Sequence, residues 1–132
     1  MNTGVELHDS RVANLVREGG DLRIVFEPAY VHHSDGIPGS NSGWGLLQPV
    51  EFRFRDATCS EMGECLGDVA DGVVVAADVE YANLVPLPLS AEGASTARIE
   101  FASGGVLTIT AGAFSCNALG DPDPNFRERY EG

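Results

Sequence analysis

Apolar side chains recur at every second position in several segments of the chain, which is the pattern of half-buried β-strands. Leu22, Ile24 and Phe26 share one face of an expected strand, and charged residues lie around them. Residues 11–17 are apolar enough to form a partner strand, and residues 18–21, which include two glycines, provide a tight turn. The pattern therefore predicts an antiparallel hairpin near the N-terminus.

Further segments show the same alternation. Residues 50–55 form the cleanest example, and residues 73–84 predict one longer strand. Residues 97–102 and 106–111 flank the turn at 103–105 and predict a second hairpin. The alternating apolar side chains of the first two segments are Val50, Phe52, Phe54, Val73, Val75, Ala77, Val79 and Tyr81.

Helical periodicity is poor along the chain. The best candidate is a short helical turn over residues 59–66, which Ser60 can cap. Short strands separated by glycine-rich turns predict an all-β, mainly antiparallel fold with little helix, either a β-sandwich or a small β-barrel. We expect a single β domain over residues 1–120. Prolines and acidic residues alternate after it, so residues 121–132 should form an irregular C-terminal tail.

The chain is strongly acidic. Its 132 residues include 20 acidic and 8 basic side chains, for a formal net charge of −12. A surface this negative repels phosphate backbones and anionic lipids, so we expect neither nucleic acid nor a membrane as partner. No apolar run approaches the roughly 20 residues that cross a bilayer, and the first residues lack a basic segment followed by an apolar stretch. We therefore expect a cytoplasmic location.

The segment 34–45 is predicted to be a long loop, with four glycines and one proline and, apart from an isoleucine and Trp44, almost nothing to bury. Loops of this length in compact domains are often functional. His32, His33, Asp35 and Trp44 combine imidazole, carboxylate and indole groups, which can bind a small ligand, a protein partner or a metal. The alternative is a flexible hairpin loop whose tryptophan folds back onto the core.

Between Arg55 and Arg98 the chain has eight acidic residues and no lysine, arginine or histidine. Because salt screens like charges that lie far apart, their repulsion has little effect on stability, and a solubilising surface is one interpretation. The other is an acidic patch that attracts a basic protein and speeds the encounter. The patch consists of Glu61, Glu64, Asp68, Asp71, Asp78 and Glu80, and the other two acidic residues of the stretch are Asp56 and Glu92.

The sequence gives little evidence for a combination of catalytic residues. His8, Asp9 and Ser10 are the residue types of a hydrolase triad, but neighbours on a strand point to opposite faces, so a turn is the better interpretation. No phosphate-binding loop occurs, and the three cysteines lack zinc or redox spacing. We therefore expect a protein without catalytic residues, cofactor or bound metal. An enzyme would have to bring distant groups together, such as His8 with His32 or His33 and a carboxylate.

The segment 7–12, with the sequence LHDSRV, is followed by a hairpin that ends at residues 22–26. This opening resembles small uncharacterised bacterial β domains, some of which are grouped with immunity proteins of toxin systems. The resemblance implies a protein that binds rather than catalyses, and it transfers no site residue. We therefore expect an immunity-like domain, monomeric or homodimeric, that presents its acidic patch to a basic protein partner. The alternative is a β-barrel that binds a small ligand or a metal through residues 32–45.

Overall fold

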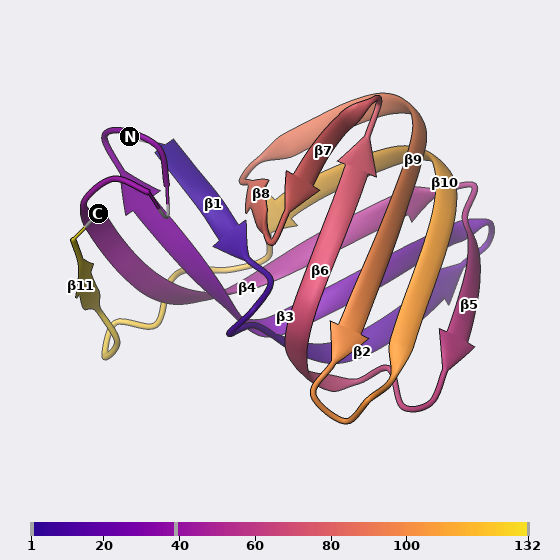
Figure 1. Ribbon diagram of the computed structural model, residues 1–132, viewed down its shortest axis with the longest axis horizontal. Helices are drawn as coiled ribbons and strands as arrows, with labels where there is room; N and C mark the ends of the chain where they lie inside the picture. The colour runs from indigo at the N-terminus through magenta and orange to yellow at the C-terminus, as the bar shows by residue number, and fades with distance from the viewer. Residues whose placement is uncertain (1, 39, 132) are drawn as a thin grey trace.

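The computed structural model of the chain is built from β-strands (Figure 1) and describes residues 2–38 and 40–131, with only the backbone described at residue 130. Gly39 of the predicted loop lies outside the described residues. Within the described part there is no helix, and so none long and apolar enough to cross a membrane. The strands are β1 (Asn2–Glu6), β2 (Arg11–Glu18), β3 (Asp21–Ser34), β4 (Gly43–Arg55), β5 (Thr58–Met62), β6 (Gly67–Ala76), β7 (Val79–Ala82), β8 (Leu84–Pro86), β9 (Leu89–Phe101), β10 (Val106–Ala118) and β11 (Glu128–Tyr130).

Six of these strands close into an antiparallel barrel in the order β4-β10-β9-β6-β2-β3, because β3 pairs back onto β4. The seam between β2 and β6 rests on two residue pairs, Arg11 with Asp68 and Val12 with Gly67. The strands β5 and β7 pair with β10 and β6 outside the closed circuit. The predicted all-β fold is confirmed, and of the two architectures that the sequence left open, the barrel is the one observed.

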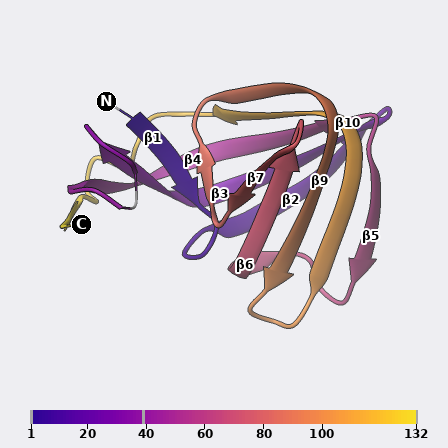
Figure 2. The same cartoon turned by 45° about the horizontal axis from the view of Figure 1, so that its top comes forward.

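The long strands β3 and β4 continue beyond the barrel. A bulge between Phe26 and Ala29 interrupts their pairing, and Pro28 lies in this bulge, where its missing N–H removes no ladder bond. Past the bulge, β1 adds to β3, β8 adds to β1 and β11 adds to β4, so that a sheet in the order β8-β1-β3-β4-β11 extends from the barrel. Figures 1 and 2 show this extension on the side of the molecule where both chain ends lie.

Aromatic side chains fill the barrel interior. The rings of Phe26 and Phe52 meet edge to face with centroids 4.7 Å apart, and Phe52 meets Phe114 in the same way at 5.1 Å. The predicted alternation in segments 22–26 and 50–54 is confirmed, since the even-numbered side chains of both are buried. Because the inward faces of adjacent strands meet across the barrel, these residues form one continuous apolar core.

The single strand predicted over residues 73–84 is wrong. The chain reverses at Ala77 and Asp78, whose φ angles are +47° and +72°, and β6 and β7 form a hairpin on either side. Two successive positive φ angles are typical of a type I′ turn. Aspartate adopts this conformation fairly readily but alanine does not, so the composition gave little sign of the turn. On β6 before the turn, Val74 and Ala76 are buried in the core, whereas Val73 and Val75 are only half-buried.

Two segments for which the sequence predicted another structure also contain strand. Residues 59–66 do not form the expected helical turn: β5 pairs with the first half of β10, and this ladder satisfies more backbone groups than one turn of helix would. In the predicted irregular tail, residues 121–127 have no regular strand, whereas β11 pairs with residues 43–45 at the start of β4.

Candidate ligand-binding site

The loop predicted over residues 34–45 is shorter in the structure, because β3 and β4 extend into it and leave residues 35–42 between them. Trp44 therefore lies in a strand. Neighbours on a strand point to opposite faces, so His33 shares a face with Trp44 while His32 lies on the other face. Asp35 is exposed and borders a recess of about 250 Å³ together with His33 and Trp44. The structure thus brings three of the four predicted site residues together and separates His32 from them.

A transverse row of side chains crosses this face. Thr3, His33, Trp44 and Arg129 lie opposite one another on β1, β3, β4 and β11. The Thr3 hydroxyl lies 3.5 Å from Nδ1 of His33. Just before β11, the Cζ atom of Arg127 lies 3.7 Å from the centroid of the Trp44 ring, and that of Arg129 lies 5.3 Å from it. Such cation–π contacts contribute about 0.5–2 kcal/mol each, so the tail carries two cations to the indole.

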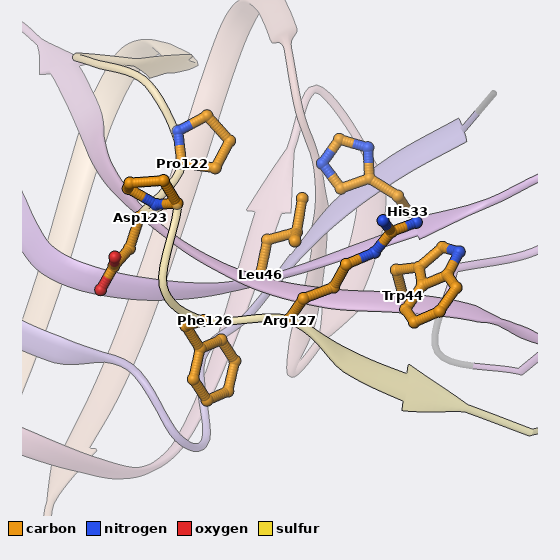
Figure 3. Close-up of a pocket in the computed structure, with 8 residues that line it drawn as sticks. His33, Trp44, Leu46, Pro122, Asp123, Phe126 and Arg127 are labelled. Carbon is orange, nitrogen blue, oxygen red and sulfur yellow. The ribbon is translucent and has the colours of Figure 1, made fainter.

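A cavity of about 320 Å³ lies between this face and the C-terminal segment (Figure 3), and we call it the tail cavity. Its volume is near the lower end of the roughly 300–1,000 Å³ typical of small-molecule sites, and its lining is mostly apolar, as theirs is. Three lining residues come from β3 and β4 and five from the tail, so the cavity depends on the tail's position. The lining consists of His33, Trp44, Leu46, Pro122, Asp123, Pro124, Phe126 and Arg127.

The tail cavity has few polar groups. Nε2 of His33 is buried and has no hydrogen-bond partner among the described residues. Burial lowers the pKa of this imidazole, so it is neutral at pH 7, and an unpartnered buried polar atom costs roughly 1–3 kcal/mol. The Asp123 carboxylate points away from Trp44 (Figure 3) and accepts a hydrogen bond from the backbone N–H of Asn125 at 2.9 Å. One end of the cavity therefore has a cation and an unsatisfied imidazole, and the other has a carboxylate.

Contacts with β3 and β4 hold the tail in place. The Tyr30 hydroxyl donates a hydrogen bond to Oε1 of Glu128 at 2.5 Å, and the phenol reaches it by lying directly over Gly45. Burial, followed by the hydrogen bond to Glu128, raises the pKa of Tyr30, so the hydroxyl keeps its proton. The backbone N–H of Asp123 donates to the carbonyl of Leu47 at 2.7 Å. Together with the pairing of β11 and β4, these contacts hold the tail residues that form the far wall of the cavity.

A second polar cluster lies around Glu6. Its Oε1 is 3.3 Å from Nε2 of His32, and the potential ligand atoms of Glu6, His8 and Asp9 lie within 4.8 Å of one another. The hydrogen bond with His32 lowers the pKa of Glu6, whereas desolvation and then the neighbouring Glu6 raise that of Asp9. Glu6 thus lies close to both His8 and His32, which are two of the imidazoles that an enzyme would have to bring together. The His8 and Asp9 side chains are each 57% exposed, so water competes for any cation here.

Ser10 takes no part in a triad. Its hydroxyl is buried and donates to the carbonyl of Glu6 at 2.5 Å, and it accepts a hydrogen bond from the N–H of Tyr30 at 2.9 Å. The backbone N–H of Ser10 also bonds to the carbonyl of Leu7, which closes a turn around Asp9. Asp9 has a φ of +77°, a conformation that aspartate tolerates better than most residues. The segment therefore shapes the backbone, as the turn interpretation expected.

The acidic patch residues are all exposed, but they lie in separate places. From Asp68 to the end of β6, the extended chain spans about 25 Å, which is well beyond the screening length of about 8 Å at physiological salt. The two ends of β6 therefore carry separate acidic surfaces. Glu61, Glu64 and Asp68 lie at the β5–β6 end, Asp71 follows on β6, and Asp78 and Glu80 lie in the β6–β7 hairpin.

Two arginines on the barrel are engaged with carboxylates. Arg23 and Arg53 are cross-strand neighbours. Arg23 contacts Glu51 and Glu18 at 2.8 Å each, and Arg53 contacts Glu18 and Asp21 at 3.2 Å. These hydrogen bonds raise the pKa of both guanidinium groups. The pairing of these positive charges with carboxylates weakens any attraction of this surface for an anionic polymer.

The tail was not predicted to be part of the candidate site. Leu46 and Phe126 line the tail cavity, and Arg127 covers its indole. A signal was present in residues 126–130 after the last proline, where two arginines alternate with Phe126, Glu128 and Tyr130. Such alternation is typical of a short edge strand, and it would have placed Arg127 and Arg129 on one face.

Comparison with known proteins gives no match to a protein family, to a curated protein or to a solved structure. The resemblance of residues 7–12 to bacterial β domains therefore stays a prediction. The tail cavity is identified by its own chemistry, which is an apolar lining around a tryptophan, an arginine and a buried imidazole atom without a partner.

Proposed function

We propose that the protein is a binding protein that holds a small, mostly apolar ligand in the tail cavity. The observation that carries this proposal is the convergence of an apolar, ligand-sized cavity with the buried, unpartnered Nε2 of His33. Sites for small molecules combine an apolar wall with a few placed polar groups, and this cavity has that composition. The proposal keeps His33 and Trp44 from the predicted loop site and adds the tail as its second wall.

Fluorescence of Trp44, the only tryptophan of the chain, tests this proposal directly. A library of small apolar compounds should contain members that shift or quench its emission with saturation. Leu46→Gln places a polar group in the lining and should weaken binding about tenfold or more, since even one methylene in an apolar pocket has this effect. Leu119→Gln is the matched control, because Leu119 is exposed and lies outside the lining. If no compound saturates the signal, or both variants lose affinity equally, the proposal fails.

A second candidate function is the binding of a basic protein at the β5–β6 end of the barrel. Met62 and Leu66 are 68% and 42% exposed there, beside Glu61, Glu64 and Asp68. An apolar centre with a charged rim is the usual anatomy of a protein interface, and the negative rim would favour a basic partner. This is the immunity-like role expected from the sequence, narrowed to one part of the acidic patch.

Retention of a basic protein from the native host on the immobilised chain tests this second function. Retention should weaken at high salt and should be lost in a Met62→Ser, Leu66→Ser double variant. Ile37→Ser is the matched control, since Ile37 is also exposed but lies in the β3–β4 loop. Retention that survives the double variant, or that ignores salt, would remove this candidate.

A further inference from the structure

From the charges around the tail cavity we infer that its ligand is a small monocarboxylate, bound with the acid group between Arg127 and His33. This inference rests on the proposed function and names the class of ligand. The Cζ atom of Arg127 lies over the Trp44 ring, and none of its guanidinium N–H groups donates a hydrogen bond within the described residues, so these donors remain available. No carboxylate lies within ion-pair distance of Arg127 in the part of the chain that the structure describes.

His33 supplies the second hydrogen-bonding group. Figure 3 shows the Arg127 guanidinium between the rings of His33 and Trp44. When the Thr3 hydroxyl donates to Nδ1 of the neutral His33 ring, the ring proton is on Nε2, the atom that lacks a partner within the described chain. The guanidinium and this N–H are then two donors at one end of the cavity. Planar, bidentate recognition of a carboxylate is what arginine does best.

The rest of the cavity sets the size and charge of the ligand. Its 320 Å³ is about the share of ten molecules in liquid water, so the ligand has roughly ten non-hydrogen atoms. Leu46, Phe126 and Pro122 provide an apolar wall for the body of the molecule. Asp123 borders the opposite end and would repel a second acid group there, which favours one carboxylate over two.

The experiment compares 4-phenylbutyrate with 4-phenylbutyramide, which have the same shape but differ in charge. Both are titrated into the full chain at pH 7 and followed by calorimetry as well as by Trp44 fluorescence. The acid should bind about tenfold or more tightly than the amide, because a charge-assisted hydrogen bond is considerably stronger than a neutral one. Arg127→Gln should abolish this preference, because the acid loses a charge-assisted hydrogen bond and the amide loses only a weaker one.

Arg98→Gln is the control for the change in net charge, since Arg98 is exposed on β9, pairs with Glu100 and lies outside the cavity lining. It should leave the preference for the acid intact. Equal affinity for acid and amide in the wild type, or a preference that survives Arg127→Gln, overturns the monocarboxylate inference. So does the failure of both compounds when other apolar compounds bind. If nothing in the apolar library binds, the proposed function itself is wrong.

Discussion

Replacing Gly45 with alanine should detach the C-terminal segment from β4. A Cβ atom at this position would lie 1.9 Å from the hydroxyl oxygen of Tyr30 and 2.4 Å from its Cζ. Gly45 lies within β4 and has no positive φ, so alanine fits the backbone and the tyrosine ring must move instead. When the ring moves, it loses its hydrogen bond to Glu128 and its edge contact with Phe126.

The expected loss of stability follows from three terms. Displacing a buried ring by overpacking costs about 1–3 kcal/mol. Because Glu128 is exposed, the lost hydrogen bond adds only about 0.5–1.5 kcal/mol. Alanine in a strand regains about 0.5–1 kcal/mol that glycine loses in backbone entropy. The free energy of unfolding should therefore fall by about 0.5–4 kcal/mol, and the tail cavity should lose its outer wall.

Urea unfolding of four proteins tests this reasoning: the wild type, Gly45→Ala, Tyr30→Ala and the double variant. Without the phenol there is no overlap, so Gly45→Ala in the Tyr30→Ala background should be neutral or stabilising by up to about 1 kcal/mol. The effect of Gly45→Ala on the free energy of unfolding thus changes from destabilising to neutral or stabilising when Tyr30 is replaced by alanine. Hydrogen exchange at the amides of β11 should also be faster in the Gly45→Ala single variant than in the wild type. Equal destabilisation in both backgrounds would refute the proposed overlap.

Three other changes test separate parts of the structure. Ser10→Ala should lower the free energy of unfolding by about 1–3 kcal/mol in urea titrations, because the buried N–H of Tyr30 loses its acceptor. Glu6→Gln should lower it by about 0.5–1.5 kcal/mol at pH 7, because a neutral amide oxygen makes a weaker hydrogen bond with His32 than a carboxylate does. Since hydrogen bonding to His32 lowers the pKa of Glu6, that difference should shrink as the pH falls below about 4.5, the unfolded value. Cys116 is fully buried with a pKa raised to about 12, so thiol reagents should modify it only at the rate of unfolding, measured by mass spectrometry.

The barrel could be predicted as far as alternation reaches. In segments 22–26 and 50–54 every second side chain is buried, and local spacing was sufficient to identify that face. Closure of the barrel depends on the two residue pairs between β2 and β6, which are far apart in the chain. The hairpin turn at Ala77 was missed because it needs a conformation that alanine seldom adopts. Local pattern therefore predicted the central parts of the long strands, but neither where each strand ends nor the short strands β1, β5 and β11.

The candidate site was predicted from only one of its walls. His33 and Trp44 belong to a segment whose glycines attracted attention, whereas Arg127 belongs to a tail whose prolines suggested irregular chain. The contact of Tyr30 with Glu128 spans nearly a hundred residues and requires the absence of a side chain at Gly45. One of the glycines read as a loop signal is thus a place where an aromatic ring crosses the strand. Composition does not distinguish these two uses of glycine.

The net charge of −12 and a carboxylate ligand are compatible because they act over different distances. Charges more than about 8 Å apart are largely screened at physiological salt. In Figure 1 β6 lies on the barrel, away from β11 and the chain ends, so the acidic groups at its two ends have little influence on affinity in the tail cavity. Affinity depends on the groups in contact, where Arg127 lies at one end and Asp123 at the other. The total charge acts mainly on the approach of a ligand and on solubility. A strongly acidic chain can therefore select an anion wherever a cation is held close and the neighbouring carboxylate is turned away.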